Sequence, residues 1–100
     1  MDKRAVLEIV KKYRKAIIPL FPDAVTYLYG SYAKNMQKEE SDIDVAVVLP
    51  KLSENYLWED SPKLWRIGGD INSLIEPVML EQNENTPLYN EVIKTGILIQ

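Results

Sequence analysis

Two aspartates separated by one residue give the clearest chemical signal in the sequence. Asp42 and Asp44 open a stretch that is otherwise apolar and ends at Pro50. Side chains of a strand alternate between its faces, so residues two apart lie on the same face, where their carboxylates can share a pair of hard cations. Two close carboxylates also repel each other, which should raise the pKa of at least one when no cation is bound. The spacing therefore predicts a Mg²⁺ site.

A Gly-Ser pair lies upstream of the aspartates, with ten residues between Ser31 and Asp42. Gly30 follows a stretch typical of a strand, and a short helix is expected to begin at Ser31. Glycine has no Cβ, so the backbone there can approach a ligand closely, and the first N–H groups of a helix point outward without partners. The pair therefore predicts a phosphate-binding turn. Lys34 could reach the same phosphate, and a solvated lysine is an equally good interpretation.

A third carboxylate would complete a site for two cations. Glu76 is the best candidate because it opens the next predicted strand among apolar neighbours, where an unpaired charge is costly. The alternative interpretation is a solvent-facing residue on an edge strand. Asp70 and Glu81 are weaker candidates, since both fall at the predicted ends of elements.

Composition limits the remaining chemistry. The 100 residues include no histidine and no cysteine, which excludes the commonest general base, the usual zinc ligands, thiol nucleophiles and disulfides. The formal net charge of −3 argues against direct, sequence-independent binding of DNA, although it is compatible with binding of a single nucleotide. No apolar run is long enough to span a membrane, so we expect a cytoplasmic protein.

Alternating helical and extended patterns must position these residues. Helices are predicted over residues 2–18, with Asp2 as the cap, from Ser61 to about residue 71, and over 86–95; strands are predicted over 24–29, 42–49, 75–80 and 97–99. Ser61 and Thr86 each precede a proline, which is typical of an N-cap followed by the first helical turn. Two consecutive glycines at 68–69 should weaken the second helix or end it early.

The order of these elements predicts an α/β (α+β) fold. We expect a single domain over residues 1–100, in which a small mixed β-sheet is flanked by helices. Pro77 cannot donate a hydrogen bond to a ladder, which favours an edge position or a bulge for its strand.

The Gly30-Ser31 pair, its spacing and the Asp42-x-Asp44 pair together resemble the signature of a minimal nucleotidyltransferase of the DNA polymerase β superfamily. The spacing is also similar to that of the MNT antitoxins that pair with HEPN toxins. The order of strands and helices, Ala33 in register and Glu76 in its Ile-Glu-Pro strand extend the resemblance over nearly the whole chain.

Two positions depart from the family pattern. Asn35 stands where a glycine is usual, and asparagine tolerates a left-handed backbone well enough for the turn to survive. Glu76 replaces the commoner aspartate and is one methylene longer.

The resemblance implies a polymerase-β-like fold and a Mg²⁺-dependent transfer of a nucleoside monophosphate, AMP from ATP in the simplest case, to a hydroxyl acceptor. Two Mg²⁺ ions, or Mn²⁺ in their place, would be held by catalytic carboxylates: Asp42, Asp44 and Glu76. Glu76 would also help to take the hydroxyl proton. The nucleotide phosphates would be bound by the turn and the lysine that follows it: Gly30, Ser31 and Lys34.

The acceptor is expected on another protein, because 100 residues hold a nucleotide site and leave none for an acceptor-binding domain. A tyrosine of a partner HEPN toxin is the acceptor that the resemblance suggests. Two alternatives stay open: a non-catalytic antitoxin or interaction module that binds nucleotide or metal, and a small-molecule nucleotidyltransferase of the aminoglycoside type. Base preference and the formation of a homo-oligomer also stay open.

The remaining aromatic and basic residues have simpler interpretations. Trp58 and Trp65 could stack on a base, but the helical spacing around Trp65 favours the core. Tyr27 and Tyr29 are expected on a face of the sheet, and Tyr32 could touch a nucleotide. A solvated helix face is the simplest interpretation of the basic residues near the N-terminus, and a docking surface for an acidic partner is the alternative: Lys3, Arg4, Lys11, Lys12, Arg14 and Lys15.

Overall fold

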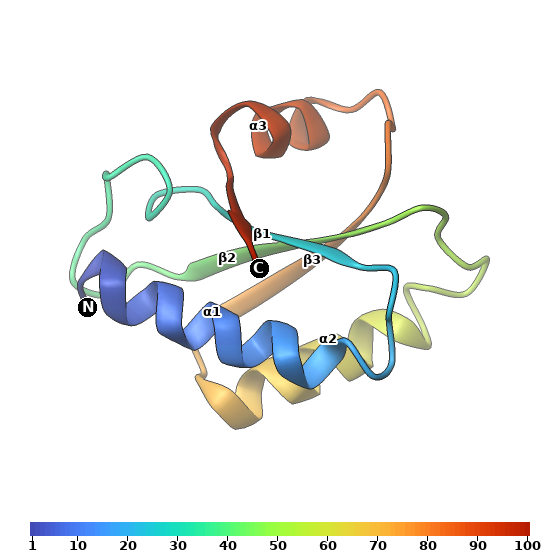
Figure 1. The fold of residues 1–100 in the computed structure, drawn as a ribbon, viewed down its shortest axis with the longest axis horizontal. Helices are drawn as coiled ribbons and strands as arrows, with labels where there is room; N and C mark the ends of the chain where they lie inside the picture. Colours follow the sequence, from blue (N-terminus) through green and yellow to red (C-terminus); the bar gives the residue numbers. More distant parts are fainter.

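In a computed structural model that describes all 100 residues, a four-stranded sheet lies between helices on both of its faces (Figure 1). The elements in chain order are α1 (Lys3–Ile17), β1 (Val25–Tyr29), β2 (Ile43–Leu49), α2 (Asp60–Ile71), β3 (Ile75–Glu81), α3 (Pro87–Thr95) and β4 (Ile97–Ile99). The strand order is β3-β2-β1-β4; β2 and β3 are parallel, whereas the other two pairs are antiparallel. This mixed sheet with flanking helices confirms the predicted fold class.

Helices α1 and α2 cover one face of the sheet, which we call the closed face (Figure 1). Asp2 caps α1 as predicted, because its carboxylate accepts a hydrogen bond of 2.8 Å from the Ala5 N–H. The Tyr13 hydroxyl donates a bond of 3.0 Å to the Leu64 carbonyl and so joins α1 to α2. The main core lies here, and its residues of lowest exposure are Val6, Val10, Tyr13, Ile17, Leu28, Tyr32, Ile43, Val45, Val47, Leu64 and Ile75.

Helix α3 covers part of the opposite face, which we call the open face. Thr86 caps this helix by accepting a 3.2 Å bond from the Tyr89 N–H, and Gly96 ends it, both as predicted. Tyr89 and Val92 pack on Ala46 and Val48 of β2 in a much smaller cluster than that of the closed face. The two faces therefore share strands but differ in the depth of their packing.

Strand β3 lies at one edge of the sheet, as Pro77 predicted. Its parallel pairing with β2 needs a crossover, which α2 supplies on the closed face. None of the helices is both long enough and apolar enough to cross a membrane.

Three local predictions were wrong. Residues 31–35 form turns rather than a helix. Helix α2 begins at Asp60, so Ser61 lies in its first turn and is not the N-cap. The buried stripe of α2 runs through Leu64 and Gly68, which leaves Trp65 47% exposed instead of in the core.

The glycine pair neither ends nor breaks α2, which continues to Ile71. A Cβ on Gly68 would lie 3.0 Å from Ile75 Cγ2 and 3.4 Å from the Tyr13 ring. The missing side chain thus lets α2 approach β3 and α1 closely, and this packing offsets the low helix propensity of glycine.

Candidate functional site

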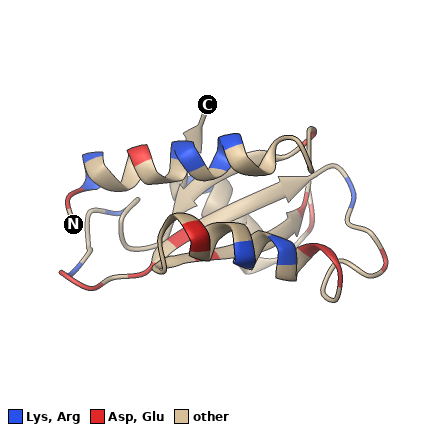
Figure 2. Ribbon diagram, turned by 90° about the horizontal axis from the view of Figure 1, so that it is seen from below, with Lys and Arg blue, Asp and Glu red and all other residues tan.

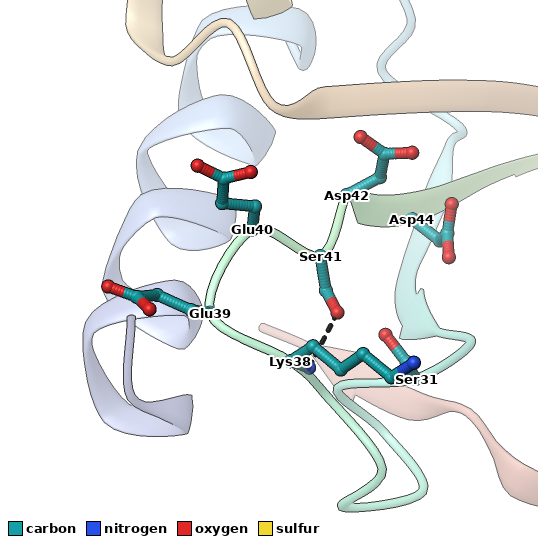
Figure 3. Close-up of a pocket in the computed structure, with 7 residues that line it drawn as sticks. All are labelled: Ser31, Lys38, Glu39, Glu40, Ser41, Asp42 and Asp44. Carbon is teal, nitrogen blue, oxygen red and sulfur yellow. Dashed lines mark hydrogen bonds between the residues drawn. The ribbon is translucent and has the colours of Figure 1, made fainter.

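Asp42 and Asp44 lie at the start of β2, on the open face. Asp42 immediately precedes the strand and is exposed, whereas Asp44 is its second residue and is half-buried. Both line a hollow of about 590 Å³ (Figure 3). All of the side chains that line it are polar: Ser31, Lys38, Glu39, Glu40, Ser41, Asp42 and Asp44. The hollow therefore suits a charged, hydrated ligand better than an apolar one.

Glu76 is brought to the aspartates by the register of the parallel pair. Its Cα partner on β2 is Asp44, so the two side chains leave neighbouring strands on the same face. The pKa of Glu76 is raised by desolvation, then by the charge of Asp42, by hydrogen bonding with Asp42 and by the charge of Asp44. The carboxylates of Asp42, Asp44 and Glu76 thus interact electrostatically across the two neighbouring strands.

Burial and neighbouring charge also act on Asp44. Its pKa is raised first by burial and then by the charges of Asp42 and Glu91. Tyr29 of β1 pairs with Asp44 in the antiparallel register, and burial together with the nearby carboxylates raises its pKa to about 12. Tyr29 therefore stays protonated beside the acidic residues at neutral pH.

The donor set fits a hard divalent cation, because it offers carboxylates and no soft ligand. Side chains of Asp42, Asp44 and Glu76 do not converge as a ready-made metal cage. Desolvation first, and then mutual repulsion, raises the pKa values of Asp44 and Glu76, and this repulsion opposes such convergence until a positive charge balances it.

Gly30 shapes the turn that faces these carboxylates. Its φ of +75° is in the left-handed region, and a Cβ at this position would overlap the Oδ2 atom of Asp44. Asn35 has φ +59°, so the turn keeps a left-handed residue where the family pattern has glycine, as predicted. Glycine at position 30 is thus required both by the backbone and by the close approach of Asp44.

The same turn presents free backbone donors, although no helix forms there. The N–H groups of Lys34 and Met36 close the turn by donating to the carbonyls of Gly30 and Ser31, at 3.2 and 2.9 Å. The N–H groups of residues 31–33 donate to no other protein atom. Ser31, whose N–H is the first of these unpaired donors, lines the hollow, so this part of the turn can bind an anion there.

Lys34 points to α3 instead of lining the hollow. Its Nζ atom lies 3.3 Å from Glu91 Oε2, in an ion pair that ties the turn to α3. Lys38 is the lysine that lines the hollow, and the turn that carries it closes when its backbone N–H donates a 2.7 Å bond to Ser41 Oγ (Figure 3). Sequence reasoning missed Lys38 and Glu91, because neither lies in a motif and Glu91 reaches the site only through the placement of α3.

The weaker candidates lie elsewhere. Asp70 is exposed on α2, and Glu81 lies at the far end of β3, opposite Leu49, where it accepts a 3.0 Å bond from the Leu52 N–H. Tyr32 is fully buried in the closed-face core, so it is not available to a nucleotide. Tyr27 and Tyr29 pack on the open face as predicted, and Trp58 is 81% exposed.

Comparison with known proteins gives one consistent result. Residues 10–100 match the protein family described as "Polymerase beta, Nucleotidyltransferase". A protein of Methanocaldococcus jannaschii named "Putative protein adenylyltransferase" is 30% identical over 97 residues, which cover 92% of this chain and 96% of that protein.

Solved structures agree on the fold. A "putative nucleotidyltransferase" from Sulfolobus solfataricus is 18% identical, with a TM-score of 0.66 over 96% of this chain and 80% of that one. A complex of a tri-AMPylated HEPN toxin with an MNT antitoxin from Shewanella oneidensis gives a TM-score of 0.58 and 24% identity, over 98% of this chain and 71% of that one. This chain belongs to the polymerase β nucleotidyltransferase family.

Proposed function

We propose that the protein is a Mg²⁺-dependent adenylyltransferase that moves AMP from ATP to a hydroxyl acceptor and releases pyrophosphate. The observation that carries this proposal is the placement of Asp42, Asp44 and Glu76 on one face of adjacent strands, with the unpaired N–H of Ser31 in the hollow that the two aspartates line. A metal-bound triphosphate carries both cations and anionic phosphates, so it requires a cation site next to an anion-binding turn.

The turn provides the phosphate end of the proposed site. Gly30 allows the backbone to approach the ligand, and the N–H groups that begin at Ser31 donate to the β- and γ-phosphate oxygens. Lys38, which lines the hollow, supplies positive charge to the same phosphates, and Lys34 would do so by exchanging its Glu91 partner for a phosphate. None of these groups has to form a covalent bond, which suits a chain without histidine or cysteine.

The carboxylates provide the other end. Asp42 and Asp44 would hold two Mg²⁺ ions together with Glu76, and such ions, when bound, stabilise the attacking and leaving oxygens of a phosphoryl transfer. Glu76 lies across from Asp44 on the edge strand and carries a raised pKa, which suits it to take the proton of the incoming hydroxyl.

We propose a protein as the acceptor, with a tyrosine of a partner HEPN toxin as the specific target. The name of the M. jannaschii relative supports a protein acceptor. The S. oneidensis complex, in which the toxin carries AMP groups beside an MNT antitoxin, supports the toxin. The role that follows is that of an antitoxin which inactivates its partner by modification.

The test is label transfer from ATP labelled at the α-phosphate to a HEPN protein encoded beside this chain, in the presence of Mg²⁺. Label on a tyrosine of that protein is expected, with none from the Asp42→Asn, Asp44→Asn double variant. Asp70→Asn is the matched control, because this carboxylate is exposed on α2 away from the hollow. Equal labelling with the double variant contradicts the proposal.

A growth assay separates catalysis from simple binding. If the double variant still protects cells from the toxin, the chemistry is dispensable and the protein acts as a non-catalytic antitoxin. If label appears on small molecules such as aminoglycosides instead of on the HEPN protein, the acceptor assignment is wrong, although the transferase assignment stands.

A further inference from the structure

The outer side of α1 concentrates positive charge in a protein that is acidic as a whole. Six of the twelve basic residues lie on this helix, with only one of the fifteen acidic residues, Glu8. Figure 2 shows these basic residues spread along the length of α1. The proposed catalytic site uses none of them.

Four of these basic residues border a hollow of about 430 Å³, together with Glu8 and Gln100: Lys11, Lys12, Arg14 and Lys15. Lys11 has a partner, Glu8 at 3.4 Å, but the other three form no ion pair. Arg14 and Lys15 lie in the last turn of α1, where the negative end of the helix dipole stabilises their charges. Lys12 lies before that turn, and its charge repels that of Lys15, three residues further along the helix. The hollow therefore favours an anionic occupant.

An open sheet edge adjoins this hollow. Strand β4 pairs with β1 on one side only, and Gln100, which lines the hollow, directly follows it. The chain end lies beside α1 (Figure 2). Ile99 is buried in the closed-face core, while Leu98 points the other way and is 46% exposed. The unpaired N–H and C=O groups of such an edge are a template for another extended chain.

We propose that β4 and the basic hollow of α1 together bind an extended acidic segment of a partner protein. The segment adds a strand to the sheet along β4, and because its side chains alternate, acidic groups at every second position lie over Lys12, Arg14 and Lys15. Hydrogen bonds between the two backbones would fix the orientation of the segment along β4, and the basic side chains of α1 would favour segments with acidic residues.

Two other occupants fit less well. A nucleic acid has no peptide groups to pair with β4, and the net charge of −3 opposes it. A second copy that paired β4 with β4 in one continuous antiparallel sheet would place both α1 helices on the same face, with their basic hollows next to each other. Like charges make that arrangement unfavourable.

The test measures binding of a labelled eight-residue peptide that alternates glutamate and threonine to the full chain. Two further peptides carry backbone N-methyl groups on one or the other set of alternate residues, so one of them blocks the hydrogen bonds to β4. The protein variants are Lys12→Gln with Lys15→Gln, and Lys63→Gln with Arg66→Gln as a matched pair of exposed positions on α2.

We expect the acidic peptide to bind, one N-methylated peptide to bind at least tenfold more weakly, and the α1 variant to lose at least tenfold in affinity while the α2 variant does not. Amide NMR signals of residues 97–100 should shift on binding. Absence of binding, equal binding of both methylated peptides, or tighter binding of an eight-nucleotide single-stranded RNA overturns the proposal. Unchanged melting temperatures of both variants show that the fold is intact.

Discussion

The closed face of the sheet is largely apolar, with Thr26 as a buried polar exception, whereas the open face is covered only by α3 and gives way to carboxylates at one end. Both faces are built from the same strands. On β2, Ile43 and Val45 enter the closed-face core, while Asp44 between them faces the hollow. Alternation along one strand thus separates the residues that hold the fold together from those proposed for chemistry.

This separation implies that the two faces respond differently to substitution. The closed face gains stability from dense apolar packing. The open face holds carboxylates whose raised pKa values show that their ionised forms are unfavourable in the fold, a cost that is common at functional sites. Substitutions on the closed face should therefore mainly lower stability, whereas substitutions of the carboxylates on the open face should lower activity without lowering stability.

The largest effect is expected from Asp44→Asn on the open face. Transfer should fall by about 10³-fold, equivalent to about 4 kcal/mol of transition-state stabilisation, because a proposed metal ligand is lost. The melting temperature should stay the same or rise by a few degrees, since a half-buried charge is removed. Label transfer and thermal melts measure the two effects, and a lower melting temperature would contradict the division between the faces.

Leucine truncation compares the two faces directly. Leu64→Ala should lower the free energy of unfolding by about 2–5 kcal/mol, because Leu64 is fully buried in the closed-face core. Leu88→Ala should cost about 1 kcal/mol, since Leu88 is only partly buried in the cluster beneath α3. Urea unfolding of both variants gives the comparison, and equal costs would show that the open face packs more tightly than its burial indicates.

Gly30→Ala should lower stability and activity together. The left-handed backbone disfavours alanine, and the added Cβ meets the Asp44 carboxylate, so we expect a loss of about 1–3 kcal/mol in the free energy of unfolding. Displacement of Asp44 should also reduce transfer in enzyme that remains folded. Gly69→Ala is a suitable control, because nothing lies within 4 Å of a Cβ at that position.

The smallest expected effect concerns pH. A carboxyl group whose pKa is raised in the folded state binds its proton more tightly there, so its ionisation lowers stability as pH rises through that pKa. The stability advantage of Asp44→Asn over the wild type should therefore be largest at neutral pH and shrink as pH falls toward 4. Melting temperatures of the two proteins from pH 7 to pH 4 test this; a gap that widens on acidification would contradict the sign.

Strong local patterns predicted most of the fold. Three- and four-residue spacing gave α1, and Asp2 and Thr86 act as the expected caps. Local patterns failed where tertiary packing determines the structure. Helix α2 continues through Gly68 because the absence of a Cβ there lets the helix pack closely against Ile75. The buried side of α2 runs through Leu64 and Gly68, so Trp65 lies outside the core.

The site was predictable to the extent that it lies in short motifs. The Gly-Ser turn and the two aspartates meet at one hollow, and Glu76 lies next to Asp44 because of a register that sequence alone does not specify. The turn itself was wrongly predicted as helical, since left-handed residues at 30 and 35 close it too tightly for a helix. Glu91 could not be found at all, because its position depends on where α3 docks.

The parallel pairing of β2 with β3 also bears on how the molecule assembles during synthesis. Residues 1–49 contain α1, β1, β2, the turn and both aspartates, but Glu76 joins Asp44 only after the crossover through α2 has formed. Contacts between segments far apart in sequence form slowly, because a long loop must close first. A nascent chain that exposes only its first half should therefore fold part of the closed face without assembling the three carboxylates, so ion binding at Glu76 would report completion of the sheet.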